Sequence, residues 1–142
     1  MDEELIMASK QAQVRSSERG SAGIKFLMVF VVLIAAGHAG YNYVPVAYAG
    51  ENFKQEMQTS VVNGMAVAGR MTPVDYVKNR IQKAIADNDL PPDTVVEVKQ
   101  VGPTVQAHAV YTQHVPILPF GLYTYQYNFD YTAVPNGYLL KQ

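Results

Sequence analysis

The sequence contains no cysteine among its 142 residues. This absence excludes disulfides, thiolate chemistry and sulfur-ligated zinc or iron–sulfur centres. A basic excess is also missing, because the formal net charge is −1, and without one the chain lacks the electrostatic footprint of a nucleic-acid-binding protein. Glycine-rich phosphate loops, nucleophile elbows and metal-binding histidine pairs on a helix do not occur either. We therefore predict a non-enzymatic protein without a nucleic-acid partner and, in the main interpretation, without a cofactor.

Charged residues are absent from one long stretch, Phe26 to Tyr48. A membrane-crossing helix needs ~20 predominantly apolar residues, and this stretch supplies them. Only Phe26 to Ala36 is densely apolar, which is the length of a signal-peptide core. A secretory signal has a short basic lead, however, whereas here some twenty-five residues with several acidic side chains come first. We therefore predict an uncleaved transmembrane signal anchor over residues 24–48, with Tyr41 and Tyr43 in the headgroup zone.

Two small-x-small sites keep a cleaved signal open as the alternative. They are Gly37-His38-Ala39 and Ala47-Tyr48-Ala49. Cleavage at either site would release a secreted or pilin-like binding domain.

The basic residues near the span predict its orientation, since Lys and Arg remain on the cytoplasmic side. Four precede the span and one follows it at a comparable distance: Lys10, Arg15, Arg19 and Lys25, against Lys54. We then expect residues 1–23 to be a flexible cytoplasmic tail, with a docking helix as the alternative. The expected location is a cell inner membrane, crossed once, with the carboxyl-terminal part periplasmic or extracellular.

Several residues within the span are candidates for contacts. Ala36, Gly37 and Gly40 would allow another helix to approach closely. His38 is the only titratable group in the run, and an intramembrane ionisable side chain indicates a haem or pigment ligand, a proton relay or a polar contact. Its place where the apolar density fades favours a neutral histidine near the outer interface. Pro45 is expected to kink or end the helix.

Two helices and three strands are predicted in the remaining domain, residues 49–134. Apolar residues at three- and four-residue intervals predict a helix over 51–68, which can continue the span beyond a break at Pro45 or near Gly50. Thr72 as N-cap and Pro73 at the first position predict a second helix over 73–87. Alternating patterns predict strands over 94–101, 104–115 and 122–133, and residues 135–142 are expected to be a tail.

The last predicted strand has the clearest pattern. Its odd positions carry one apolar or aromatic stripe: Tyr123, Tyr125, Tyr127, Phe129 and Tyr131. A shift of register by one residue would expose all five rings, so we expect them to be core. Their expected cover is the apolar face of the second helix, Val74 to Ile85.

The loop Val115 to Leu122 is unusually apolar for a connection. It contains four large apolar side chains, Ile117, Leu118, Phe120 and Leu122, and two prolines that stiffen the backbone. Exposed contiguous apolar surface commonly marks a contact with a partner or a membrane. Burial beneath the sheet is the alternative. If exposed, the loop would lie near the anchored end of the domain and face the bilayer or a neighbouring subunit.

The whole pattern resembles a poorly characterised family of bacterial single-pass envelope proteins. The matching residues are Arg19-Gly20, the anchor, Tyr43-Val44-Pro45 and the helix-to-strand order from Thr72 to Thr132. Arg19 to Ala22 is also similar to the start of pilus-assembly (TadE-like) membrane proteins, although Lys25 stands near the place where those carry Glu. The first resemblance implies fold and topology and no activity.

The predicted fold class is α+β: one N-terminal transmembrane helix, then two helices packed on a three-stranded antiparallel meander. The predicted function is that of an accessory or assembly subunit of a larger membrane complex, with the lipid bilayer and other membrane subunits as partners. One alternative is a cofactor- or pigment-binding subunit that uses His38. The other is the secreted or pilin-like domain that signal cleavage would release.

Overall fold

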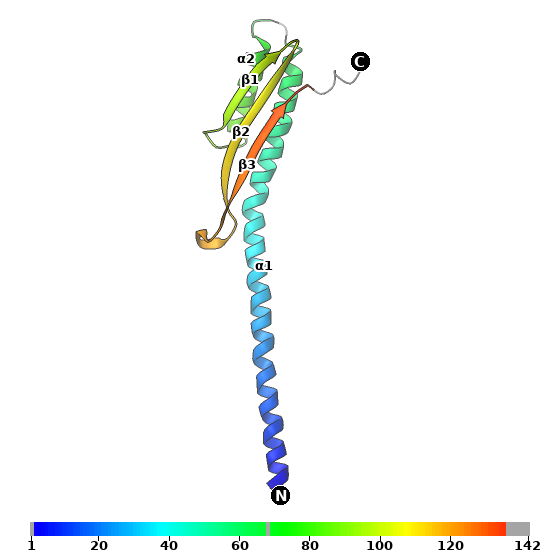
Figure 1. The fold of residues 1–142 in the computed structure, drawn as a ribbon, viewed down its shortest axis with the longest axis vertical. Helices are drawn as coiled ribbons and strands as arrows, with labels where there is room; N and C mark the ends of the chain where they lie inside the picture. The colour runs from blue at the N-terminus through cyan, green and yellow to red at the C-terminus, as the bar shows by residue number, and fades with distance from the viewer. Residues whose placement is uncertain (1, 68, 136–142) are drawn as a thin grey trace.

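The computed structural model describes residues 2–67 and 69–135 and shows a pair of helices packed on one sheet (Figure 1). The elements in chain order are α1 (Asp2–Gly64), α2 (Pro73–Asp87), β1 (Val95–Val101), β2 (Thr104–Pro116), the short turn η1 (Pro119–Gly121) and β3 (Thr124–Ala133). The prediction of an α+β fold with two helices on a three-stranded antiparallel sheet is confirmed. The predicted tail from residue 136 onward lies outside the described residues.

Helix α1 is one continuous element of 63 residues, with Pro45 inside it. The predicted end of the helix at Pro45 or near Gly50 is therefore wrong, and residues 2–23 belong to the same helix. A proline removes one helical hydrogen bond. Contacts with the sheet hold the helix on both sides of it: His38 lies against the β2–β3 connection and Phe53 lies in the core. Tertiary packing thus keeps the chain helical past Pro45, although proline disfavours a helix interior.

Helix α2 begins and ends where the sequence predicted. The Thr72 hydroxyl accepts a hydrogen bond from the Asp75 amide at 3.1 Å and donates to the Asp75 carboxylate at 2.7 Å. This exchange satisfies one of the free amides of the first turn. At the other end, the Asn88 amide and side chain both donate to Ala84 O, so the helix stops before the two prolines.

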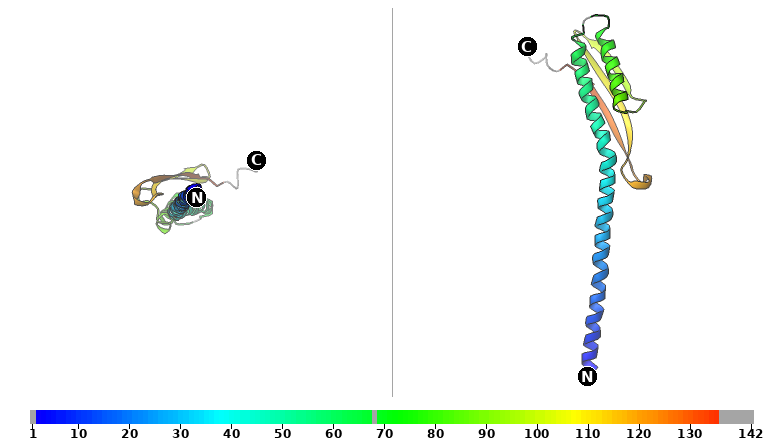
Figure 2. Two further views of the ribbon diagram at one scale, coloured as in Figure 1. Left: turned by 90° about the horizontal axis from the view of Figure 1, so that it is seen from below. Right: turned by 180° about the vertical axis from the view of Figure 1, so that it is seen from behind.

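The sheet order is β1-β2-β3, with antiparallel pairing throughout. Both helices cover the same face (Figure 2). Helix α1 packs against β2 and β3, whereas α2 packs against β1 and β2. The prediction that α2 covers the aromatic stripe of β3 is therefore wrong. The short connection from α2 into β1 keeps α2 beside β1, at the opposite edge from β3, so α1 must cover the rest.

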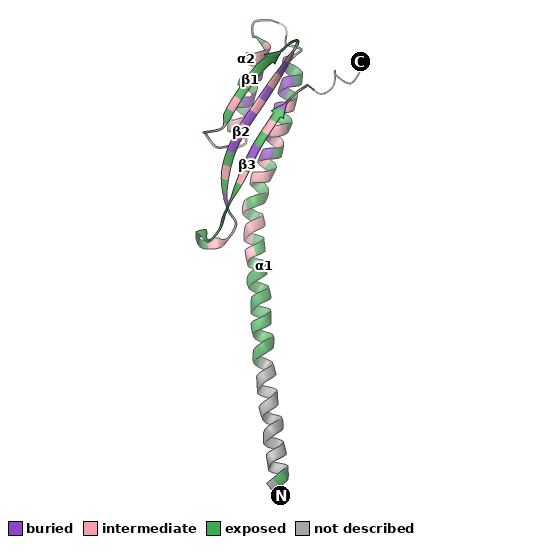
Figure 3. Ribbon diagram, in the orientation of Figure 1, coloured by how far each residue is buried: buried purple, intermediate pink, exposed green. Residues whose placement is uncertain are grey.

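The core lies between the upper half of α1, helix α2 and the sheet (Figure 3). Helix α1 contributes Phe53, Met57 and Val61, and α2 contributes Val77, Ile81 and Ala84. The facing strand positions include small residues, Ala107, Ala109 and Ala133, which let the helices approach closely.

Burial changes along the aromatic stripe of β3. Phe129 is buried, Tyr127 and Tyr131 are half-buried, and Tyr123 and Tyr125 are exposed. The prediction that all five rings belong to the core is correct only for the upper part of the strand. The lower part extends past α2, so only α1 lies beside it.

Candidate functional site

The connection between β2 and β3, residues 116–123, reaches far down α1 (Figure 1). We call it the hairpin tip. Strand β2 has 13 residues and spans about 40 Å at ~3.3 Å per residue. Helix α1 needs about 26 residues for the same length, because it rises only ~1.5 Å per residue. The tip accordingly lies beside His38, which precedes the end of α1 at Gly64 by 26 residues.

His38 links the helix to the hairpin tip. Its Nδ1 lies 3.1 Å from the carbonyl oxygen of Ile117. A carbonyl only accepts hydrogen bonds, so Nδ1 carries the proton and donates. The other ring nitrogen, Nε2, lies 3.3 Å from the Asn42 side-chain amide. A cofactor ligated by His38 would have to use Nε2, and this role stays a prediction.

The backbone of the hairpin tip satisfies several of its own donors. Pro116 and Pro119 carry no N–H group. Three backbone hydrogen bonds close the tip: Ile117 N to Tyr123 O at 3.0 Å, Leu118 N to Tyr123 O at 3.2 Å and Leu122 N to Pro119 O at 3.4 Å. Phe120 adopts a positive φ of 61°, which turns the chain sharply at the lowest part of the hairpin.

The predicted contact residues of the tip divide into two pairs. Phe120 is 98% exposed and Leu122 is 75% exposed. Ile117 and Leu118 are half-buried. The tip therefore presents large apolar side chains outward and does not fold under the sheet.

The small residues predicted to contact a partner lie on a different surface. At about 100° per residue, Ala36 and Gly40 are each about 160° round the helix from His38. They point away from His38. A Cβ added at Gly37 or Gly40 would meet nothing within 4 Å. The structure thus separates the predicted contact residues into the tip and a small-residue face, which we define as Ala36, Gly37 and Gly40.

Tyrosines surround the junction between the tip and the helix. The Tyr43 ring lies 5.9 Å from that of Tyr125 and 6.3 Å from that of Tyr127, in edge-to-face arrangements. Sequence reasoning placed Tyr43 near the headgroups and Tyr125 in the core, and it missed their contact. The available signal for this contact was that tyrosines occur in both segments.

Above this junction lie the buried Tyr111 and the half-buried Tyr127. A Cβ at Gly50 would collide with the Tyr127 hydroxyl and lie 3.3 Å from the Tyr111 hydroxyl, so the glycine makes room for both. Within the described part of the chain, the Tyr111 hydroxyl is buried without a hydrogen-bond partner. Burial raises the pKa of Tyr111 to about 12, with a smaller contribution from Tyr127. Burial likewise raises the pKa of Tyr127.

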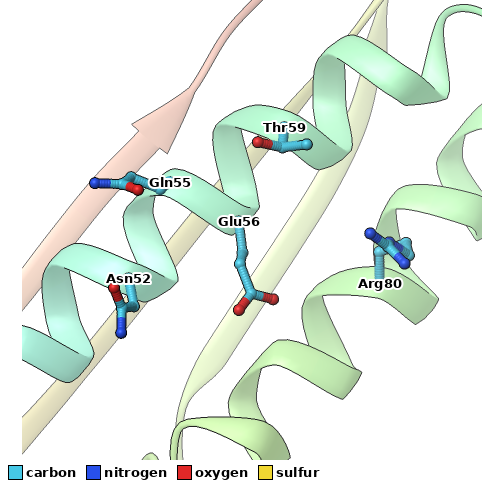
Figure 4. A pocket seen from close by; sticks show the side chains of 5 residues that line it. All are labelled: Asn52, Gln55, Glu56, Thr59 and Arg80. Atoms are coloured by element: carbon cyan, nitrogen blue, oxygen red, sulfur yellow. The ribbon is translucent and has the colours of Figure 1, made fainter.

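A shallow polar groove between the two helices was not predicted. Figure 4 shows its lining, which consists of Asn52, Gln55, Glu56, Thr59 and Arg80. Glu56 comes from α1 and Arg80 from α2, and the Asn88 side chain donates to Glu56 at 3.5 Å. The groove is an open surface depression near the upper end of the domain.

The two strand histidines contact β3 on the uncovered face of the sheet. His108 Nε2 lies 2.7 Å from Asp130 Oδ1, and His114 Nε2 lies 3.4 Å from Gln126 Nε2. Over residues 2–67 and 69–135, no group of three or more metal-ligating side chains comes together.

Comparisons with protein-family models, curated proteins and solved structures gave no match. The resemblance to single-pass envelope proteins therefore stays a prediction.

Substituting His38→Leu is expected to loosen the hairpin tip. The Ile117 carbonyl would lose its donor in a half-buried place, at a cost of about 1 kcal/mol. Hydrogen exchange on the full chain in mild detergent should show faster exchange at the Ile117 and Leu118 amides. Asn42→Ala is the control, because it removes the neighbouring amide and leaves the bond to Ile117. Equal protection of the tip in both variants would contradict the role assigned to His38.

Proposed function

We propose that the chain is a non-enzymatic accessory or assembly subunit of a larger membrane complex, anchored by one span with its folded domain outside the cytoplasm. The observation that carries the proposal is the continuity of α1, which passes from an exposed apolar segment directly into the core of the domain. Between Gly20 and Gly64 the helix is long and apolar enough to cross a membrane, and its most apolar window of 18 residues is wholly unburied.

The exposed apolar segment needs a covering. Its large side chains are each more than half exposed: Ile24, Phe26, Leu27, Met28, Val29, Phe30, Val31, Val32, Leu33 and Ile34. A contiguous apolar surface of this kind marks a membrane or protein contact. Because these side chains surround the whole helix, lipid is the fitting cover for most of them.

The packing of the domain supports an uncleaved anchor. Cleavage after Ala39 would remove His38 and its bond to Ile117. Cleavage after Ala49 would also remove Tyr43 and its contacts with β3. Both alternative sites thus lie within the length of helix that the hairpin uses. Amino-terminal sequencing that finds Gly40 or Gly50 as the first residue would contradict the proposal.

The small-residue face supports a partner within the membrane. Ala36 and Gly40 lie on the side of α1 away from His38, and a Cβ at Gly40 would meet nothing within 4 Å, so a second helix could approach there. Such a contact would leave the sheet and the tip on the outside of the assembly.

Extraction in mild detergent followed by native gel electrophoresis tests the proposal. We expect the wild-type chain in a high-mass band and Gly40→Leu predominantly in a low-mass one, because the new side chain would separate the helices. Gly20→Leu is the matched control, since an added Cβ at Gly20 likewise meets nothing within 4 Å. A wild-type chain that migrates as a monomer would contradict the proposed function.

A further inference from the structure

We propose that the hairpin tip is a second membrane element, which lies among the lipid acyl chains of the outer leaflet beside α1. The inference rests on the anchoring of α1 proposed above. It goes further in assigning lipid, rather than a protein subunit, as the partner of Phe120 and Leu122.

The height of the tip along α1 supports this placement. Lys25 is the last charged residue before the apolar run, and His38 follows it by 13 residues, or about 20 Å of helix. The hydrocarbon core is ~30 Å thick. A core that begins at Phe26 therefore extends about 10 Å beyond His38. Since the tip bonds to His38, it lies about 10 Å deep, at the far limit of the depth of about 5–10 Å at which interfacial segments bury their apolar faces.

Charge stops at the same height on α1 and on β3. Helix α1 has no Asp, Glu, Lys or Arg from Phe26 to Gly50, and the hairpin has none from Gln100 to Phe129. The next charged residues are Glu51 and Asp130. They flank one packed level, because Phe53 and Phe129 are in ring contact at 5.5 Å. The lower part of the hairpin thus shares the uncharged character of the helix segment beside it.

The backbone of the tip meets part of the strictest requirement of a lipid environment. Lipid offers no hydrogen-bond partners, so irregular backbone in the hydrocarbon layer must satisfy its own polar groups. Two prolines remove donors, three internal bonds satisfy others, and His38 supplies a donor to the Ile117 carbonyl. The imidazole thereby donates the hydrogen bond that water would donate to an exposed carbonyl.

A set of exposed tyrosines extends from the tip toward the lipid headgroups. Tyr41, Tyr43 and Tyr48 on α1 and Tyr123 and Tyr125 on the hairpin are all exposed. Tyrosine collects at the membrane interface because its ring is apolar and its hydroxyl is polar. The contact of Tyr43 with Tyr125 shows that the two elements carry these rings at one height.

The absence of cysteine makes a direct depth measurement possible. Phe120→Cys in the full chain would be labelled with a polarity-sensitive fluorophore and reconstituted in phosphatidylcholine–phosphatidylglycerol vesicles. We expect blue-shifted emission, strong quenching by lipids with a nitroxide on the upper acyl chain, and several-fold weaker quenching by iodide than at the control position. Val95→Cys is the control, because Val95 is 65% exposed on the edge strand β1.

Each outcome of the measurement has one meaning. Iodide quenching at Phe120→Cys equal to that at Val95→Cys, in chains that resist carbonate extraction, would overturn the inference and leave the anchor intact. Shielding from both iodide and nitroxide lipids would assign the tip to a protein contact and also overturn it. Release of the chain by carbonate would refute the proposed anchoring itself. Only nitroxide quenching with weak iodide access supports the inference.

Discussion

Phe53→Ala is expected to cost the domain about 3–5 kcal/mol of stability, the usual range for deleting a buried phenylalanine. Phe53 is fully buried. Its ring lies 5.5 Å from that of Phe129 and 6.3 Å from that of Tyr111, so it joins α1 to β2 and β3. Domains have only about 5–15 kcal/mol in total. The substitution should therefore remove much of the stability that holds the hairpin on the helix.

Urea unfolding of the full chain in mild detergent, followed by far-ultraviolet circular dichroism, measures this effect. Val62→Ala is the matched control, because Val62 lies on the same helix with its side chain exposed. A surface change of that kind should stay within about 0.5 kcal/mol. Similar urea midpoints for the two variants would show that the domain does not depend on the α1–sheet interface.

Raising the pH from 9 to 12 is expected to destabilise the domain by roughly 2–3 kcal/mol through Tyr111. Its pKa rises from 10.0 to about 12 on folding, and each pKa unit corresponds to 1.36 kcal/mol. Below pH 10 both the folded and unfolded chains keep the proton, so the contribution is fully present. Between pH 10 and 12 the unfolded chain loses the proton first, and stability falls with pH.

Tyr111→Phe should reduce this alkaline loss. At pH 8 the variant should also gain about 1 kcal/mol, since it removes a buried hydroxyl that lacks a partner. Tyr48→Phe, at an exposed position of α1, controls for the loss of a tyrosine elsewhere. Urea midpoints at several pH values measure both effects. A pH dependence identical to the wild type in Tyr111→Phe would contradict the assignment to this group.

Local signals predicted the elements that depend on local chemistry. The bounds of α2 could be read from Thr72, Pro73 and the prolines after Asn88, because caps act within a few residues of the chain. The strands could be read from their alternation, which one covered sheet face imposes. The observed strand bounds differ from the predicted ones by no more than two residues.

Features that depend on packing could not be read in the same way. The continuity of α1 past Pro45 rests on contacts with a hairpin about seventy residues later in the chain. The cover of β3 was assigned to α2 because the pattern of that helix was the clearest one available. The order of the strands in the sheet decides which helix covers which strand. The periodicity of apolar residues along the sequence does not reveal that order.

The candidate site shows the same division. His38 and Ile117 were each recognised from their own surroundings, one as an ionisable group in an apolar run and the other as part of an apolar loop. Their hydrogen bond joins residues 79 positions apart. The length match between strand and helix brings them together, and that match appears only when the rises of the two elements are compared in the folded chain.

The continuity of α1 also makes the domain a lever. Gly64 lies 26 residues beyond His38, or about 39 Å. Membrane helices tilt by about 20° on average, and a change of that size would swing the far end of the domain sideways by about 13 Å. The region around His38, close to the pivot, would hardly move. Any neighbour that changes the inclination of the span would thereby reposition the distant α1–α2 turn.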